Sequence, residues 1–386
     1  MTDKIVIGFI PLVDAASLLV AADFGFAEAE GIAIELVRDV SWANIREKLS
    51  AGVFDAAHLL APMAVASSLD LMPGSVPLAA PYVLATNGNA ITISTELFAH
   101  LSAELKERPP TPLATAQALA AIIESRNRAG KPPLTFGTTF PFSCHTYLLR
   151  FWMAAGGINT AEDVRIISLP PPYMVENLQN GEVDGFCVGA PWNSVAVDLG
   201  AGQILHFGCD IAQRLTEKVI AARCDWIDRN QERTIRLMRA ISAAASFVAE
   251  SANWEASCAR LSAPDRIGAK GELIQRALSG VLNVGHEGAL KSDSRYLILG
   301  AQGRARPDPA QAAWFYSQMI RWGQAKFDDG LSEAAQAVLS PTLFDKVFPD
   351  LPRCDEATPN DGLGLFAGPF FEKDRIAVYL NAMSGS

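Results

Sequence analysis

Short apolar strands alternate with helices in two separate series along the chain. In the first series the strand Lys4–Phe9 leads through a loop into a helix and then to a second strand at 33–37. In the second series a strand at 134–137 leads into a helix expected at 143–155, which two glycines end. Strand–helix–strand units of this kind imply parallel strands. The pattern therefore predicts an α/β protein with a sheet in each series.

The segments that join the two series indicate how the chain is divided. Apolar runs at 78–84 and 90–94 flank an Asn-Gly pair, which suits either a tight turn or one kinked crossover between domains. A strand at 219–223 returns to the first series, and the chain beyond residue 228 is expected to be mostly helical, with a polar loop at 283–309. A crossover out and a crossover back predict two lobes over a cleft. The expected boundaries are 1–87 plus 216–386 for lobe I and 88–215 for lobe II.

Composition restricts the class of protein. With 386 residues, 49% of them hydrophobic, the chain can bury more than one domain's core. A net charge of −10 argues against direct nucleic-acid binding, which needs a basic face. The six scattered cysteines suit free thiols in a reducing compartment. The sequence enters a strand at once, without an export leader or a membrane-spanning run, so we expect a cytoplasmic protein that is not bound to a membrane.

Hydrogen-bond donors follow several of the predicted strands. They are Trp42, Asn89 and His145, together with Lys218 just before the returning strand. Ligands of open α/β sheets bind beyond the carboxyl ends of the strands, so these side chains are expected to face the cleft. No carboxylate is expected among them. A pocket of donors with one or two positive charges predicts a site for a small oxyanion.

Each of these residues also has an ordinary structural explanation. Trp42 alone suits a packing aromatic, Asn89 a turn residue, His145 a helix cap and Lys218 a solvated surface residue. The neighbouring Cys144 suits a small buried apolar side chain. The hypothesis of an anion site therefore rests on the donors as a set.

Other kinds of function find less support in the sequence. The chain has no GxGxxG or GxxxxGK[ST] motif for a nucleotide, and no HExxH or CxxC spacing for a metal. The adjacent pair Cys144-His145 suggests nucleophilic chemistry, but side chains next to each other near a helix start usually point apart. We therefore expect no enzyme, no cofactor and no metal.

Several segments in order resemble the nitrate/bicarbonate-binding family of transporter solute receptors. They read IGFIPLVDAASLLVAADFGFAEAEGI, SWA, DAAHLLAPM, HTYLLRFWMAAGGIN, PPPYMVENLQNGEVDGFCVGAPWN and EKVIAARCDWIDRN. The resemblance covers residues 4 to about 250 and, more loosely, 314–324. It implies the two-lobed periplasmic-binding-protein fold of the second type, with the ligand in the cleft between the lobes.

The family's ligand positions can be carried over one at a time. Its tryptophan falls on Trp42, its histidine on His145, its lysine on Lys218 and its proline loop on Pro171 and the prolines on either side. A glutamine that the family commonly has is Asn89 here, a shorter amide donor. Its GEPWN turn reads GAPWN, which removes an acidic residue, so the resemblance implies no essential calcium. A lysine where bicarbonate receptors tend to be acidic implies nitrate, with nitrite the nearest rival.

The missing leader makes the chain more similar to the cytoplasmic NasS nitrate/nitrite sensors than to exported receptors. Those sensors hold an RNA-binding antiterminator of the NasT type, an ANTAR-type regulator, and release it when the anion binds. The resemblance therefore implies nitrate or nitrite and a NasT-like regulator as partners. Two alternatives stay open, namely the solute-binding component of a nitrate ABC transporter and an enzyme related to the pyrimidine synthases of thiamin biosynthesis, which share the fold.

Overall fold

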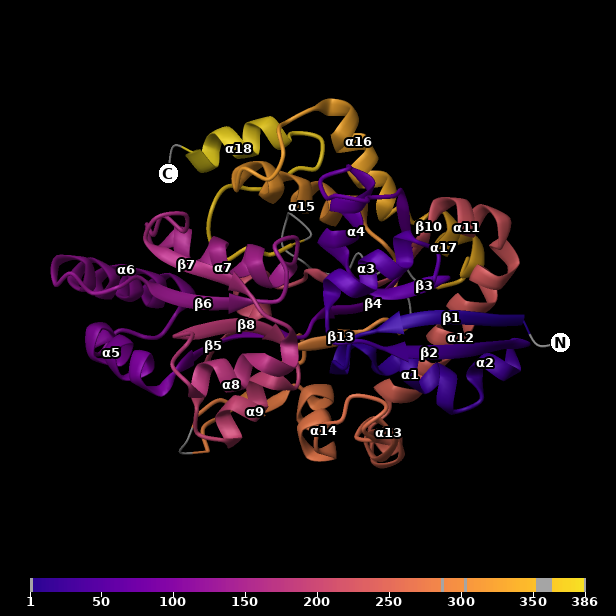
Figure 1. The fold of residues 1–386 in the computed structure, drawn as a ribbon, viewed down its shortest axis with the longest axis horizontal. Helices are drawn as coiled ribbons and strands as arrows, with labels where there is room; N and C mark the ends of the chain where they lie inside the picture. Colours follow the sequence, from indigo (N-terminus) through magenta and orange to yellow (C-terminus); the bar gives the residue numbers. More distant parts are fainter. Residues whose placement is uncertain (1–2, 286–287, 302–303, 352–362, 385–386) are drawn as a thin grey trace.

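The computed structural model describes residues 3–285, 288–301, 304–351 and 363–384, and it contains two main sheets with helices packed around them (Figure 1). One sheet has six strands in the order β13-β4-β10-β3-β1-β2, and the other has five in the order β7-β6-β8-β5-β9. β1 pairs in parallel with β2 and β3, and β6 pairs in parallel with β7 and β8, which confirms the predicted α/β class. The strands are β1 Asp3–Phe9, β2 Ile32–Arg38, β3 Ala56–Leu60, β4 Leu78–Asn87, β5 Asn89–Ser94, β6 Leu134–Thr138, β7 Val164–Ser168, β8 Gly185–Gly189, β9 Gly202–Phe207, β10 Thr216–Arg223, β11 Val281–Asn283, β12 Leu290–Ser292 and β13 Leu297–Leu299.

Helices connect the strands in both sheets, and α7 agrees with the helix predicted at 143–155. None of the helices in the described ranges is long and apolar enough to cross a bilayer. The helices are α1 Ala16–Asp23, α2 Phe26–Ala29, α3 Trp42–Ser50, α4 Ala61–Ser68, α5 Thr95–Leu105, α6 Pro112–Arg128, α7 Cys144–Ala155, α8 Met174–Gln179, α9 Trp192–Asp198, α10 Gly208–Ile211, α11 Cys224–Arg229, α12 Gln231–Ala249, α13 Trp254–Leu261, α14 Gly271–Ser279, α15 Pro309–Arg321, α16 Asp329–Val338, α17 Thr342–Val347 and α18 Ile376–Ser384, with short 3-10 turns η1 Val13–Ala15, η2 Pro171–Tyr173 and η3 Ser251–Asn253.

The helix α7 follows the predicted pattern closely. The hydroxyl of Ser143 accepts a hydrogen bond from the Thr146 amide at 3.1 Å and caps the helix start. The helix stops before Gly156-Gly157, where Gly157 has a φ of 87°. The first helix of the chain differs from the prediction, because Gly25, with a φ of 83°, separates α1 from α2.

The kinked crossover, one of the two alternatives for residues 78–94, is what the structure shows. β4 lies in one sheet and β5 in the other, joined at Asn87 and Gly88, which have φ values of 59° and 96°. Asn87 also makes hydrogen bonds to the returning crossover. Its backbone N–H donates to Leu215 O at 2.9 Å, and its side-chain Oδ1 accepts from Leu215 N at 3.0 Å. The two crossovers therefore lie side by side. The boundaries predicted for the two lobes, at 87/88 and 215/216, stay a prediction.

The expected polar loop at 283–309 contains two strands, so that part of the prediction is wrong. β13 pairs antiparallel with β4, with Leu297 opposite Asn87. The three apolar residues of β13 complete the edge of the six-stranded sheet, although a run this short is hard to recognise in the sequence. A Cβ on Gly88 would lie 2.7 Å from Cδ1 of Leu297 and would require the φ of 96° that glycine adopts here, so a larger residue at the crossover would be strained and would displace the Leu297 side chain.

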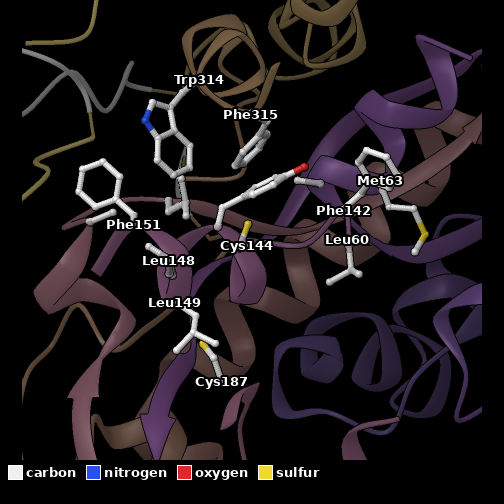
Figure 2. Packing of buried hydrophobic residues seen from close by; sticks show 14 of the residues in the cluster. Leu60, Met63, Phe142, Cys144, Leu148, Leu149, Phe151, Cys187, Trp314 and Phe315 are labelled. Carbon is white, nitrogen blue, oxygen red and sulfur yellow. The ribbon is translucent and has the colours of Figure 1, made fainter. Parts of the chain in front are cut away.

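One apolar cluster continues across both sheets and the C-terminal helices. Figure 2 shows Cys144, Leu148 and Phe151 of α7 below Trp314 and Phe315 of α15. Polar contacts add to this packing, since Tyr147 donates its hydroxyl to the side chain of Gln324 at 2.9 Å. Helices α15, α16 and α18 lie together at one side of the molecule (Figure 1). The chain after the second crossover thus packs against α7 as well as against the first sheet.

Candidate anion-binding site

A cluster of charged and polar side chains is buried where the two sheets meet. The six-stranded sheet and its loops supply Asp14 from η1, Trp42 from the start of α3, His58 from β3, and Glu217 and Lys218 from β10. The five-stranded sheet supplies Asn89 from β5 and His145 from the first turn of α7, with Thr139 in the loop before it. All of these residues are at most 5% exposed.

Lys218 holds the fixed positive charge of this cluster. Its Nζ lies 2.7 Å from Glu217 Oε1 and 2.9 Å from Asp14 Oδ2. The same atom lies 5.5 Å from the centre of the Trp42 ring, within the range of a cation–π interaction. The ammonium group is therefore shared between two carboxylates and one aromatic face.

Glu217 connects that lysine to the five-stranded sheet. Its Oε2 accepts a hydrogen bond from Asn89 Nδ2 at 2.7 Å, and its Oε1 lies 3.2 Å from His145 Nε2. The other ring nitrogen of His145 is 2.9 Å from the Thr139 hydroxyl. Contacts from β5, α7 and β10 thus meet at one carboxyl group.

Asp14 and His58 form the opposite end of the cluster. His58 Nδ1 accepts from the Ile10 amide at 3.4 Å, so its proton lies on Nε2, which is 3.0 Å from Asp14 Oδ1. The His58 ring also packs against Trp42, with ring centres 5.4 Å apart. Asp14 is therefore fixed by His58 on one oxygen and by Lys218 on the other.

Burial and charge move the pKa values of these groups. Burial lowers the pKa of His145 to about 4, although Glu217 raises it, and burial also lowers the pKa of His58. Burial alone would raise the pKa of Asp14, but Lys218 and His58 outweigh it and hold that pKa at about 2. Burial alone would lower the pKa of Lys218, yet Asp14 and Glu217 raise it above its ordinary value. The cluster thus contains neutral imidazoles, a charged lysine and a charged Asp14 near neutral pH.

Four of the five residues expected at the ligand meet in this cluster, namely Trp42, Asn89, His145 and Lys218. The Trp42 indole N–H is buried and has no hydrogen-bond partner among the described residues. A donor of this kind is free to bind an acceptor placed beside it. The fifth residue, Pro171, begins η2 after β7 and accepts from the Met174 amide. No contact found in the described part of the chain joins Pro171 to the cluster.

The expectation of a site without carboxylates is wrong, because Asp14 and Glu217 both belong to it. Asp14 follows β1 just as Trp42 follows β2, so the rule about strand ends could have found it. Glu217 was not singled out because the returning strand was predicted to begin only at 219, whereas β10 begins at Thr216. In a regular strand that begins there, the side chains of Glu217 and Lys218 would face opposite sides of the sheet. A bulge in β10 removes that alternation.

A group of potential metal ligands lies outside this cluster. Cys209, Asp210 and Asp293 bring one ligand atom each to within 4.8 Å of one another, and they are the one such group found among the described residues. Both carboxylates already have cationic partners, since Asp210 pairs with Lys291 and Asp293 with Arg295. The group is therefore an ion-pair cluster between β9, β12 and their neighbours, and it offers no open set of ligands.

The chain has two sheets joined by two crossovers, and both sheets supply residues to one buried polar cluster. This arrangement is typical of the two-lobed fold of solute-binding proteins. A solved structure agrees with this fold: the periplasmic nitrate-binding protein NrtA from Synechocystis PCC 6803 superposes with a TM-score of 0.88 at 24% identity, covering 99% of this chain and 98% of that one. The predicted periplasmic-binding-protein-like fold is confirmed.

Sequence comparison extends the likeness from fold to family. The model of the NMT1-like family matches residues 2–262. The nitrate/nitrite binding protein NrtA of Nostoc sp. is 31% identical over 99% of this chain and 86% of its own length. The bicarbonate transport ATP-binding protein CmpC of Synechococcus elongatus is 30% identical over 98% of this chain, which spans only 54% of that protein. The chain belongs to the NMT1-like family and, within it, to the nitrate/bicarbonate-binding solute receptors.

Proposed function

We propose that this chain binds nitrate or nitrite in the buried cluster between its two sheets. The observation that carries the proposal is the meeting of Lys218, His145 and Asn89 from both sheets, beside the unpartnered indole of Trp42. These groups supply one permanent positive charge and several N–H donors, which suits a planar oxyanion that can only accept hydrogen bonds. The names of the relatives, which include nitrate/nitrite binding proteins, support the same ligand.

Calorimetric titration of the purified chain with nitrate, nitrite and bicarbonate tests this proposal. Saturable binding of nitrate or nitrite, with a stoichiometry near one and weaker binding of bicarbonate, is expected. Absence of binding for both nitrogen oxyanions would overturn the ligand assignment. Tighter binding of bicarbonate would show that Lys218 does not set the preference.

The cluster supports binding rather than catalysis. Burial raises the pKa of the Cys144 thiol well above its ordinary value, and the sulfur donates to the Thr216 carbonyl at 3.2 Å. A protonated, enclosed thiol is a poor nucleophile, which argues against the enzyme alternative. The relatives named as binding proteins point in the same direction.

We further propose that the chain acts in the cytoplasm as a nitrate/nitrite sensor that releases a NasT-like RNA-binding antiterminator when the anion binds. Five free cysteines in the described part of the chain are consistent with a reducing compartment. The net charge of −10 suits a partner whose RNA-binding surface is basic. A site supplied by both sheets gives the anion a direct influence on how the lobes are held.

The second candidate is the solute-binding component of a nitrate ABC transporter. It is favoured by the names of the relatives. These include the nitrate import ATP-binding protein NrtC of Synechocystis sp., although this chain spans only 54% of that protein. Both candidates use the same anion site and differ in the partner. Identification of the protein that copurifies with the chain, an RNA-binding regulator or a permease, decides between them.

A further inference from the structure

The carboxyl group of Glu217 contacts three of the donor side chains that the proposed function assigns to the anion. Lys218 Nζ and His145 Nε2 lie 2.7 Å and 3.2 Å from its Oε1, and Asn89 Nδ2 donates to its Oε2 at 2.7 Å. Glu217 is 0% exposed, so no water competes for these contacts from bulk solvent. A carboxylate is a planar oxyanion with acceptor oxygens only, as nitrate is.

We propose that the Glu217 side chain is a built-in stand-in for the ligand, which occupies the donor set in the absence of the anion and is displaced when the anion binds. The proposal rests on the proposed function of this donor set as an oxyanion site. It makes Glu217 a residue that sets affinity and selectivity, because every ligand must compete with a carboxylate already in place.

The charges of the cluster support displacement over simple addition. Lys218 already lies between two carboxylates, at 2.7 Å from Glu217 and 2.9 Å from Asp14. A nitrate placed beside both would bring a third negative group to one buried lysine, where repulsion is weakly screened. The ligand therefore gains these donors fully only when one carboxylate withdraws.

Asp14 is the carboxylate that stays. Its Oδ1 lies 3.0 Å from the protonated Nε2 of His58, and His58 is in turn held by the Ile10 amide. Among the contacts of the described residues, none joins Asp14 to His145 or Asn89. Asp14 thus contacts Lys218 and His58, whereas Glu217 contacts Lys218, His145 and Asn89.

The stand-in also gives donors from both sheets one shared acceptor. Asn89 and His145 come from the five-stranded sheet, while Glu217 and Lys218 come from the other. Lys218 and Asn89 would be enclosed without this acceptor if Glu217 were absent, which would be costly, so Glu217 links the two sheets at this point. The anion exchanges one acceptor for another, so its binding changes the connection between the sheets rather than creating it.

Two variants of Glu217 test the proposal in the full chain. Glu217→Gln keeps the volume and removes the charge, and Glu217→Ala removes the competing group. Both are expected to bind nitrate at least tenfold more tightly than the parent in calorimetric titration, with circular dichroism confirming the fold. The matched variant Asp14→Asn removes a charge from the same lysine without freeing the donors, so it is expected to tighten binding much less. Weaker nitrate binding by a folded Glu217→Gln or Glu217→Ala, or equal tightening by Asp14→Asn, overturns the proposal.

Formate gives a readout that is independent of nitrate. In Glu217→Ala the small carboxylate replaces the deleted group, so millimolar formate is expected to bind and to raise the melting temperature of this variant but not that of the parent. If the parent binds neither nitrate nor nitrite while formate still stabilises Glu217→Ala, the proposed function fails and the stand-in remains. If the parent binds nitrate and formate leaves Glu217→Ala unchanged, the stand-in fails and the proposed function remains.

Discussion

Glu217 and Lys218 are neighbours in β10, yet both side chains enter the same buried cluster, with Glu217 Oε1 2.7 Å from Lys218 Nζ. In a regular strand these side chains would face opposite sides of the sheet. The register explains the difference, because Thr216 lies opposite Thr86 and Lys218 opposite Ala85, so Glu217 is an extra residue in β10. Such a bulge re-aims a side chain next to a functional site. Here it places an acid and a base side by side at the junction of the lobes.

The first prediction concerns Lys218, the fixed cation of the site. If nitrate binds at Lys218 as proposed, Lys218→Ala removes a charge-assisted hydrogen bond to the buried anion, worth about 1.5–3 kcal/mol, so nitrate binding should weaken roughly ten- to a hundredfold. The variant also leaves Asp14 and Glu217 without their cation, which should lower the free energy of unfolding by about 3–5 kcal/mol. Titration calorimetry measures the first effect and urea denaturation the second.

Lys291→Ala is the matched control for this prediction. Lys291 also pairs with an aspartate, Asp210, and lies 4.4 Å from the centre of the Phe207 ring, but outside the site and partly exposed. It should leave nitrate binding unchanged. Parent-like affinity in folded Lys218→Ala would remove Lys218 from the binding site.

The site shows how far local sequence rules reach. Trp42, Asn89 and His145 were found because donors at strand ends of an α/β sheet face one cleft, and the folded chain brings them together. A prediction of Glu217 would have required knowledge of the bulge in β10. The bulge depends on the pairing of β10 with β4, a strand about 130 residues earlier in the sequence. The ligand role carried over for Pro171 came from a resemblance, and the contacts that hold η2 are local to it.

The fold was predictable where the pattern is long and repeated. Strands β1 and β6 and helix α7 follow directly from apolar runs, a serine cap and terminal glycines. β13 was missed because it is three residues long and its place is set by the free edge of β4. The packing of α15 on α7 through Trp314 and Phe151 also depends on tertiary contacts that no local pattern encodes.

The second prediction uses the unpartnered indole of Trp42. Trp42→Phe retains an aromatic ring beside Lys218 and His58 but removes the N–H, which has no partner among the described residues. If the anion accepts from this donor, nitrate binding should weaken by about 1–2 kcal/mol, while the unliganded protein should lose little stability. Calorimetry and thermal unfolding without nitrate separate the two effects.

Trp314→Phe is the control for that experiment. The Trp314 N–H is likewise buried and unpartnered within the described ranges, but it lies in the core between α15 and α7. This variant should not change nitrate affinity. If both substitutions weaken binding equally, the effect comes from packing and the indole of Trp42 does not contact the ligand.

The third prediction is a loss of stability in mild acid. The pKa of His145 is about 4 in the folded chain, below its ordinary value near 6.5, because the ring is buried. Between these values the unfolded chain takes up a proton that the native ring does not, so the free energy of unfolding falls as the pH falls. The contribution is at most about 1.4 kcal/mol per pH unit for one group. His58 and His206 act in the same direction, since burial lowers the pKa of both.

Urea denaturation between pH 7 and pH 4 measures this loss. His145→Gln cannot take up the proton when it unfolds, so its stability should depend less steeply on pH than that of the parent. His100→Gln is the control substitution, because it changes an imidazole that lies outside the buried cluster and whose side chain is 65% exposed. An unchanged slope in His145→Gln would show that this residue is not the group that resists protonation.

The last prediction concerns the regulatory partner. A partner that prefers one arrangement of the lobes loses affinity when nitrate favours another, and nitrate affinity must fall by the same factor when the partner is bound. The proposed anion site connects β10 of one sheet with β5 and α7 of the other, so the proposed exchange of the Glu217 contacts for nitrate would alter that connection. Purification from cells grown without nitrate should yield a complex with an RNA-binding regulator, and millimolar or lower nitrate or nitrite should dissociate it. The Lys218→Ala variant should form the complex and require at least tenfold more nitrate to release it. Persistence of the complex at saturating nitrate, or recovery of a permease in its place, would reject the sensor and favour the transport receptor.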